Sequence, residues 1–161
     1  MSPVMSPVMI PVTSPVRIWP ARPLDAGKLA GILADANAAL GWLPRVFTGA
    51  EEIMLIGDMI DAGWIRIACL EGSAAGFIAR KGTEIHGLAV RPSLQGRGIG
   101  RTLMHDAQRN AQKLGLWSYA ANSRATGFYE TAGFREITRS DGSGNEARLP
   151  DIRFEWVREQ R

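Results

Sequence analysis

Two kinds of hydrophobic spacing alternate along this chain. Apolar residues recur every three or four positions over residues 24–40 and 48–60, and this spacing predicts two successive helices. Gly41 is placed to end the first helix, and Thr48 with Glu51 has the spacing of a capping box at the start of the second. Residues 17–20, 64–70 and 75–80 have the short apolar runs of strands, and a turn at 71–73 predicts that the last two form a hairpin.

The clearest helical stripe covers residues 99–114, and Gly115 is placed to close it. A strand at 116–121, a short helix at 125–132 and strands at 134–139 and around 152–156 complete the pattern. Hairpins early in the chain and a strand–helix–strand crossover later predict an α+β fold with a mixed sheet.

The strand expected at residues 84–90 would alternate between two faces of the sheet. Strict alternation puts two pairs of side chains on one face, Glu84 and His86 with Leu88 and Val90, and leaves Ile85, Gly87 and Ala89 on the other. We therefore expect Glu84 and His86 to share the face that carries Leu88 and Val90.

The first sixteen residues differ from the rest. They read MSPVMSPVMIPVTSPV, and the prolines at positions 3, 7, 11 and 15 forbid a helix. The segment has neither the basic start nor the continuous apolar stretch of a signal peptide. The pattern predicts a proline-rich disordered tail over residues 1–16 and one domain over residues 17–161.

Composition narrows the function classes. The chain has 161 residues, 45% of them hydrophobic and 22% charged, with a net charge of +3. This balance suits one globular domain with an anionic small ligand, and it lacks the clustered positive charge of a nucleic-acid binder. The single cysteine, Cys69, excludes an internal disulfide and a cysteine-based metal site. No apolar run approaches the roughly 18 residues of a membrane span. We expect a cytoplasmic protein with no nucleic-acid or membrane partner.

A glycine-rich segment joins the strand at 84–90 to the clearest helix. Its glycines allow a tight turn, and its main-chain N–H groups open a helix N-terminus, which favours a phosphate or pyrophosphate. The spacing lacks the third glycine of a dinucleotide fingerprint and the Gly-Lys-Ser/Thr of a Walker A loop. The segment therefore predicts a phosphate site of another kind, made by Gln95, Gly96, Arg97, Gly98, Ile99, Gly100 and Arg101.

The segment from Gln95 to Gly100 fits the pattern Q/R-x-x-G-x-G/A. Leu-Ala-Val-Arg-Pro precedes it at residues 88–92, and Asn-Ser-Arg-Ala-Thr-Gly-Phe-Tyr-Glu-Thr-Ala-Gly-Phe follows at 122–134. Together these segments resemble the GCN5-related N-acetyltransferase (GNAT) family. The resemblance covers residues 17–157 and implies a three-layer α/β/α arrangement, in which a mostly antiparallel sheet splays between its fourth and fifth strands.

The resemblance also implies roles for individual residues. The main chain of Leu88, Ala89 and Val90 would pair with the pantetheine arm of acetyl-CoA, and residues 95–101 would hold its pyrophosphate. Asn122 would bond the pantetheine region and Phe128 would pack near it. Tyr129 matches the family's usual general acid, which protonates the departing sulfur.

Acyl transfer to an amine also needs a group that takes the amine's proton. Glu84 and His86 are both candidates, directly or through a water, and Glu84 resembles a carboxylate that many family members carry on this strand. Trp42 and Phe47, on either side of Pro44 and Arg45, either pack or border the acceptor.

The expected activity is direct transfer of an acetyl group from acetyl-CoA to a primary amine of a small molecule or peptide, through a ternary complex. Cys69, expected to be buried and outside the motifs, does not favour a covalent intermediate, and no metal is implied. Three alternatives stay open: a CoA-binding regulatory module without turnover, another acyl-CoA, or a protein amine. The resemblance also leaves a homodimer open.

Overall fold

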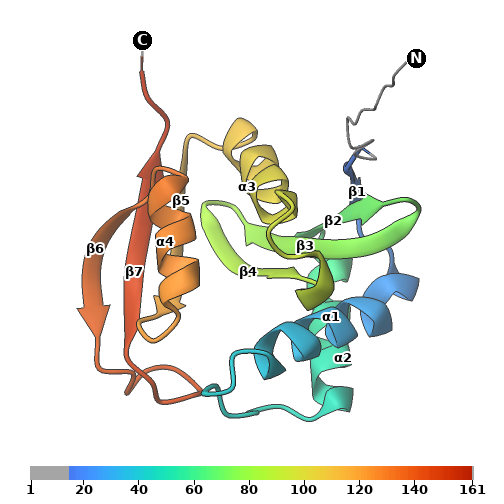
Figure 1. The fold of residues 1–161 in the computed structure, drawn as a ribbon, viewed down its shortest axis with the longest axis horizontal. Helices are drawn as coiled ribbons and strands as arrows, with labels where there is room; N and C mark the ends of the chain where they lie inside the picture. The colour runs from blue at the N-terminus through green and yellow to red at the C-terminus, as the bar shows by residue number, and fades with distance from the viewer. Residues whose placement is uncertain (1–14, 161) are drawn as a thin grey trace, which may run out of the picture.

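Within residues 15–160, seven strands join into one sheet in the order β1-β2-β3-β4-β5-β7-β6 (Figure 1). The structure is a computed structural model that describes residues 15–160. The predicted tail at 1–16 lies almost entirely outside the described residues, although Val16 packs against the core beside β1. The strands are β1 (Arg17–Pro20), β2 (Ile65–Leu70), β3 (Ser73–Lys81), β4 (Glu84–Val90), β5 (Lys113–Tyr119), β6 (Arg135–Ser140) and β7 (Asp151–Val157).

Four helices in the described part of the chain cover the two faces of this sheet. They are α1 (Ala26–Ala38), α2 (Gly49–Asp61), α3 (Ile99–Arg109) and α4 (Ser123–Thr131), with short 3-10 turns at Pro23–Asp25 and Pro92–Leu94. Alternate residues of β3 divide the core: Phe77 packs with α1 and α2, whereas Ile78 packs with α3. The predicted α+β class, mixed sheet and three layers are confirmed.

The sheet is split in the middle. Every neighbouring pair of strands is antiparallel except β4 and β5, which are parallel and are registered only at Glu84 and Gly115. Beyond that pair the strands diverge, as Figure 1 shows. The sheet therefore has two halves, and the edge of β4 from Leu88 to Val90 faces a gap.

Local signals in the sequence predicted several element ends. The Thr48 hydroxyl accepts from the Glu51 N–H at 3.2 Å, and the Glu51 carboxylate accepts from the Thr48 N–H at 2.9 Å, so the capping box is confirmed. Gly41 follows α1 with a φ of 78°, which favours glycine. The predicted turn between β2 and β3 contains Glu71 and Gly72, both with positive φ.

The prediction that the long helix reaches residue 114 was wrong. Helix α3 ends at Arg109, and β5 begins at Lys113. The Arg158 guanidinium donates to the carbonyl oxygens of Gln108, Arg109 and Ala111 at 2.7 to 3.3 Å, and these bonds replace further helical ones. Gly115 lies inside β5, where an added Cβ would clash with the Arg153 guanidinium.

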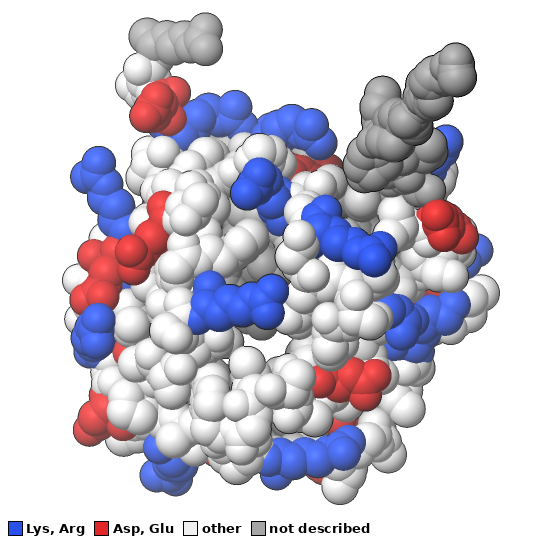
Figure 2. Space-filling model, viewed as in Figure 1, with Lys and Arg blue, Asp and Glu red and all other residues white. Residues whose placement is uncertain are grey.

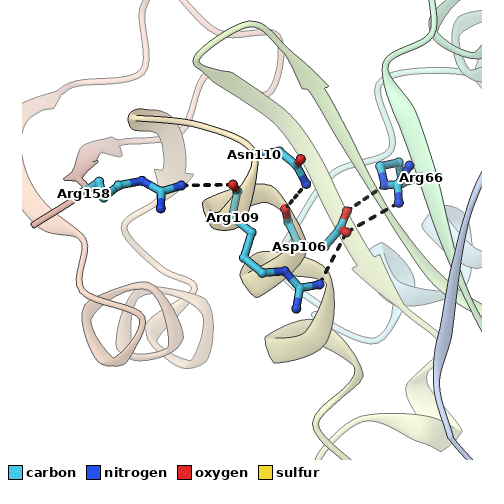
Figure 3. Close-up of polar contacts among 5 residues, drawn as sticks. All are labelled: Arg66, Asp106, Arg109, Asn110 and Arg158. Carbon is cyan, nitrogen blue, oxygen red and sulfur yellow. Dashed lines mark hydrogen bonds and ion pairs between the residues drawn. The ribbon is translucent and has the colours of Figure 1, made fainter.

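A buried carboxylate joins α3 to the sheet (Figure 3). Asp106 accepts from Arg66 of β2 at 2.7 Å and lies 3.8 Å from Arg109, and its main-chain oxygen accepts from Asn110 at 2.7 Å. Figure 3 also shows Arg158 reaching the carbonyl at the end of the same helix. Polar contacts from β2 and from the residue after β7 therefore hold α3, the helix that begins at the glycine-rich turn.

The prediction of strict alternation along β4 was also wrong. Ile85 pairs with Arg80 and Gly87 with Ala79, so His86 is an extra residue in a β-bulge. The bulge reverses the alternation: Ile85 packs into the same core cluster as Leu88 and Val90, whereas Ala89 packs into the other. Glu84 and His86 therefore do not belong to one regular face with Leu88 and Val90.

Candidate active site

A cavity of about 420 Å³ lies at the split in the sheet. Figure 2 shows this face of the molecule hollowed at its centre, with Lys and Arg side chains around the hollow. The end of β4, the glycine-rich turn, the first turns of α3, most of α4 and the end of α1 line it. It brings together twelve of the residues that the sequence singled out: Leu88, Ala89, Val90, Gln95, Gly96, Gly98, Ile99, Gly100, Arg101, Asn122, Phe128 and Tyr129.

The glycine-rich turn presents main-chain donors at this cavity. Gly96 and Gly98 have φ values of 82° and 83°, a left-handed conformation that glycine adopts without strain. Gly98 is the N-cap of α3, and its carbonyl accepts from Thr102 N–H at 3.0 Å. Within residues 15–160, the N–H groups from 96 to 101 have no hydrogen-bond acceptor. Unpaired N–H groups at a helix N-terminus attract an anion.

Two side chains link the halves of the sheet beside this turn. Gln95 donates to the Val90 carbonyl at 3.2 Å, and Arg124 of α4 donates to the Gln95 side chain at 3.0 Å. Arg124 lines the cavity and was not predicted as a site residue. Its signal was its position two residues after Asn122, in the first turn of the same helix. Arg97, in contrast, is exposed and does not line the cavity.

Helix α4 supplies the opposite wall. The Asn122 side chain accepts from Ala125 N–H at 3.1 Å, which makes Asn122 the N-cap and leaves its amide NH₂ free to donate. Phe128 packs toward the glycine-rich turn, since a Cβ on Gly100 would lie 3.6 Å from its ring. The wall therefore combines an apolar ring with one oriented amide.

Tyr129 packs among three phenylalanine rings in this wall. Its ring centroid lies 5.5 Å from that of Phe128 and 5.9 Å from those of Phe134 and Phe154. Among residues 15–160 its hydroxyl has no hydrogen-bond partner, and buried polar side-chain atoms there all have one, so the hydroxyl opens into the cavity. Burial of the ring raises the pKa of Tyr129 to about 12. The hydroxyl therefore stays protonated at physiological pH.

Neither base candidate lines the cavity. The Glu84 carboxylate accepts from Arg153 Nη1 at 2.7 and 2.9 Å, across the join between β4 and β5. His86 stacks on Trp64 at 5.1 Å, and the Lys81 ammonium lies 5.4 Å from the same Trp64 ring. A role for either in taking a proton would require a water between it and the cavity.

Three further predictions can be placed. Cys69 is half-buried rather than fully buried, and burial raises the pKa of its thiol. Phe47 lines a second, smaller cavity, and Trp42 packs edge-on against Tyr119 at 5.9 Å. Over residues 15–160, no cluster of three His, Cys, Asp or Glu could hold a metal, and no helix is long and apolar enough to cross a membrane.

Comparison with known proteins agrees with this geometry. Residues 50–136 match the sequence model of the family described as Acetyltransferase (GNAT) domain. The chain belongs to the GNAT family. An N-acetyltransferase of Archaeoglobus fulgidus is 35% identical to this GNAT chain over 102 residues, covering 53% of the chain and 69% of the relative. The peptidyl-lysine N-acetyltransferase YjaB of Salmonella typhimurium is 29% identical over 93 residues, covering 57% of the chain and 64% of YjaB.

Solved structures share the fold of this GNAT chain. The solution structure of YjaB from Escherichia coli has a TM-score of 0.75 at 23% identity, covering 89% of this chain and 99% of YjaB. The PaiA N-acetyltransferase of Thermoplasma acidophilum, solved in complex with coenzyme A, has a TM-score of 0.66 at 18% identity, with coverage of 89% and 99%. The predicted family is confirmed, and this GNAT chain is an acyltransferase.

Proposed function

We propose that this acetyltransferase moves the acetyl group of acetyl-CoA directly to a primary amine while both substrates are bound. The observation that carries the proposal is the row of unpaired N–H groups from 96 to 101 at the mouth of the cavity. Arg101 and Arg124 line the same cavity, so a pyrophosphate would meet both amide donors and guanidinium groups. The residues present therefore fit acetyl-CoA.

The rest of the cavity suits the arm of the same molecule. Beyond Glu84, β4 has no registered partner in β5, so the main chain of residues 88–90 can pair with the amides of a pantetheine arm. The free amide of Asn122 faces the same space. Acetyl-CoA supplies an activated thioester, and the chain orients it along the split.

Tyr129 is the proposed general acid. During transfer the amine nitrogen bonds to the acetyl carbon, the carbon–sulfur bond breaks, and the departing sulfur takes a proton from the Tyr129 hydroxyl. A free thiol has a reference pKa near 8.5, well below the raised pKa of Tyr129, so the hydroxyl must be held close to the sulfur to act. The amine loses its proton to water, with Glu84 or His86 as more distant acceptors in a relay, and the Tyr129 phenolate regains a proton from water.

The acceptor is an amine of a small molecule or of a peptide. Similarity to the peptidyl-lysine N-acetyltransferase YjaB supports a lysine side chain, and we propose a peptide lysine as the first acceptor to test. We also propose a cytoplasmic location and one catalytic domain over residues 17–161.

Release of free thiol from acetyl-CoA tests the proposal, with lysine peptides, small amines and aminoglycosides as acceptors and mass spectrometry of each product. A product heavier by one acetyl group, formed without a labelled enzyme intermediate, is expected. Tight binding of acetyl-CoA with no turnover for any amine would instead favour a regulatory module.

A further inference from the structure

A second cavity of about 240 Å³ lies beside the first. The loop after α1 and the connection between β6 and β7 both line it, and Figure 1 shows these two segments approaching each other near the end of α1. Asn37 of α1 lines both cavities, so the last turns of α1 form their shared wall. A molecule that spanned the two cavities would therefore pass Asn37.

The middle of the second cavity is apolar. Leu43, Val46, Phe47 and Ala147 line it together with Ala34 and Ala38 of α1. Tyr119 closes the end of β5, where Trp42 contacts its ring edge-on. This wall suits a hydrocarbon segment.

The lining of the second cavity carries more negative than positive charge. Glu52 is 8% exposed and accepts from Arg45 at 2.7 Å, and Arg45 also donates to the Phe47 carbonyl at 3.0 Å, so these two charges offset each other. Glu146 is exposed at the rim and has no ion-pair partner among residues 15–160. The lining therefore keeps one uncompensated negative charge.

The negative charge of Glu146 also affects the tyrosine hydroxyl that lines this cavity. The pKa of Tyr119 is raised, first by burial and then by the nearby charges of Glu146 and Asp151. Tyr119 consequently remains a neutral hydroxyl at physiological pH. An anionic group in this cavity would meet Glu146 without a free cation to balance it.

We propose that Glu146, at the second cavity, selects amine acceptors with a second positive group, away from the reacting amine. This inference rests on the proposed acetyl transfer. The acceptor class is an elongated primary amine with an apolar middle and a distant cationic end, as in a diamine or a lysine beside another basic residue. Its reacting amine would pass Asn37 toward the thioester, and its far end would lie at Glu146.

Three acceptors with six carbons each test this selection. Hexane-1,6-diamine carries a far ammonium, hexylamine carries a far methyl group, and 6-aminohexanoate carries a far carboxylate. We expect kcat/KM to decrease in that order, with about a three- to tenfold preference for the diamine over 6-aminohexanoate, as suits one exposed charge. The preference is expected to shrink at high ionic strength, because salt screens exposed charges.

Reversing the charge of Glu146 tests whether this residue causes the preference for the diamine. In Glu146→Lys the order of the diamine and 6-aminohexanoate is expected to invert, while hexylamine changes little. Glu159→Lys is the matched control, because Glu159 is exposed beyond β7 and lines neither cavity. An unchanged order of acceptors in Glu146→Lys, with turnover intact, would overturn the inference and leave the proposed acetyl transfer standing.

A binding measurement keeps the two proposals separable. Ligand-observed NMR with hexane-1,6-diamine in the presence of coenzyme A reports binding without turnover. Binding that Glu146→Lys removes, with no acetylated product, would show that Glu146 binds the diamine but would refute the inference that such amines are acceptors. Neither binding nor turnover for the diamine, with hexylamine accepted, would overturn the inference.

Discussion

Replacing Tyr129 with phenylalanine isolates one hydroxyl at the centre of the proposed mechanism. The ring contacts to Phe128, Phe134 and Phe154 do not involve that hydroxyl, so the packing of the wall is expected to survive. A general acid contributes about 10²- to 10⁴-fold to a rate. We therefore expect kcat to fall about a hundredfold or more, with the KM for acetyl-CoA changed by less than about twofold.

The raised pKa predicts how this acid depends on pH. The Tyr129 pKa rises from 10.0 to about 12, and at 1.36 kcal/mol per unit the fold favours the protonated form by roughly 3 kcal/mol. Because the folded-state pKa exceeds the unfolded one, this contribution to stability is present below pH 10 and is lost as the pH rises toward 12. The wild-type rate should therefore show no descending limb from loss of this acid below pH 10.

Steady-state thiol release between pH 6 and 10 measures both the kcat of Tyr129→Phe and the pH profile of the wild type. The acceptor used is the one that gives the fastest turnover. Tyr119→Phe removes the chain's other tyrosine hydroxyl from the second cavity and is expected to change the KM for the amine more than kcat. If Tyr129→Phe retained kcat within about twofold at every pH, the general-acid assignment would be refuted.

Three other substitutions test the binding turn and the core. Gly98→Val places a side chain at a φ of 83°, at a cost of about 1–2 kcal/mol. Calorimetry should therefore show an acetyl-CoA affinity at least tenfold weaker. The control Gly127→Ala in α4 should leave the affinity unchanged. Arg124→Ala should weaken acetyl-CoA binding about three- to tenfold at low salt, and an effect independent of salt would contradict its charge role. Asp106→Ala should lower the free energy of unfolding in urea by about 2 kcal/mol. This is less than for a fully buried pair, because the Arg66 side chain is 41% exposed. An unchanged urea midpoint would be inconsistent with a stabilising bond between Arg66 and Asp106.

Features that depend on neighbouring residues were predictable from the sequence. The capping box of Thr48 and Glu51 needs only a three-residue spacing, and the turn at 95–101 needs only its glycines. Most residues of the main cavity follow from the resemblance to the GNAT family, because the motifs that carry it lie in three short segments, the end of β4, the turn and α4.

Features that depend on distant residues were not predictable. The bond between Glu84 and Arg153 joins positions 69 residues apart, and nothing near Glu84 indicates it. The end of α3 depends on Arg158, about fifty residues further along the chain. The bulge at His86 follows from the pairing of β4 with β3, so alternation within β4 alone put the base candidates on the wrong face.

The two halves of the sheet meet at a single registered pair between β4 and β5. A bound molecule that supplied amides along residues 88–90 would act as the missing strand between the two halves, and its binding energy would add to the free energy of unfolding by mass action. Destabilising substitutions far from the cavity should then be tolerated when this bound molecule is abundant and become damaging when it is scarce. The amount of folded enzyme in a cell would thus follow the supply of its acyl donor.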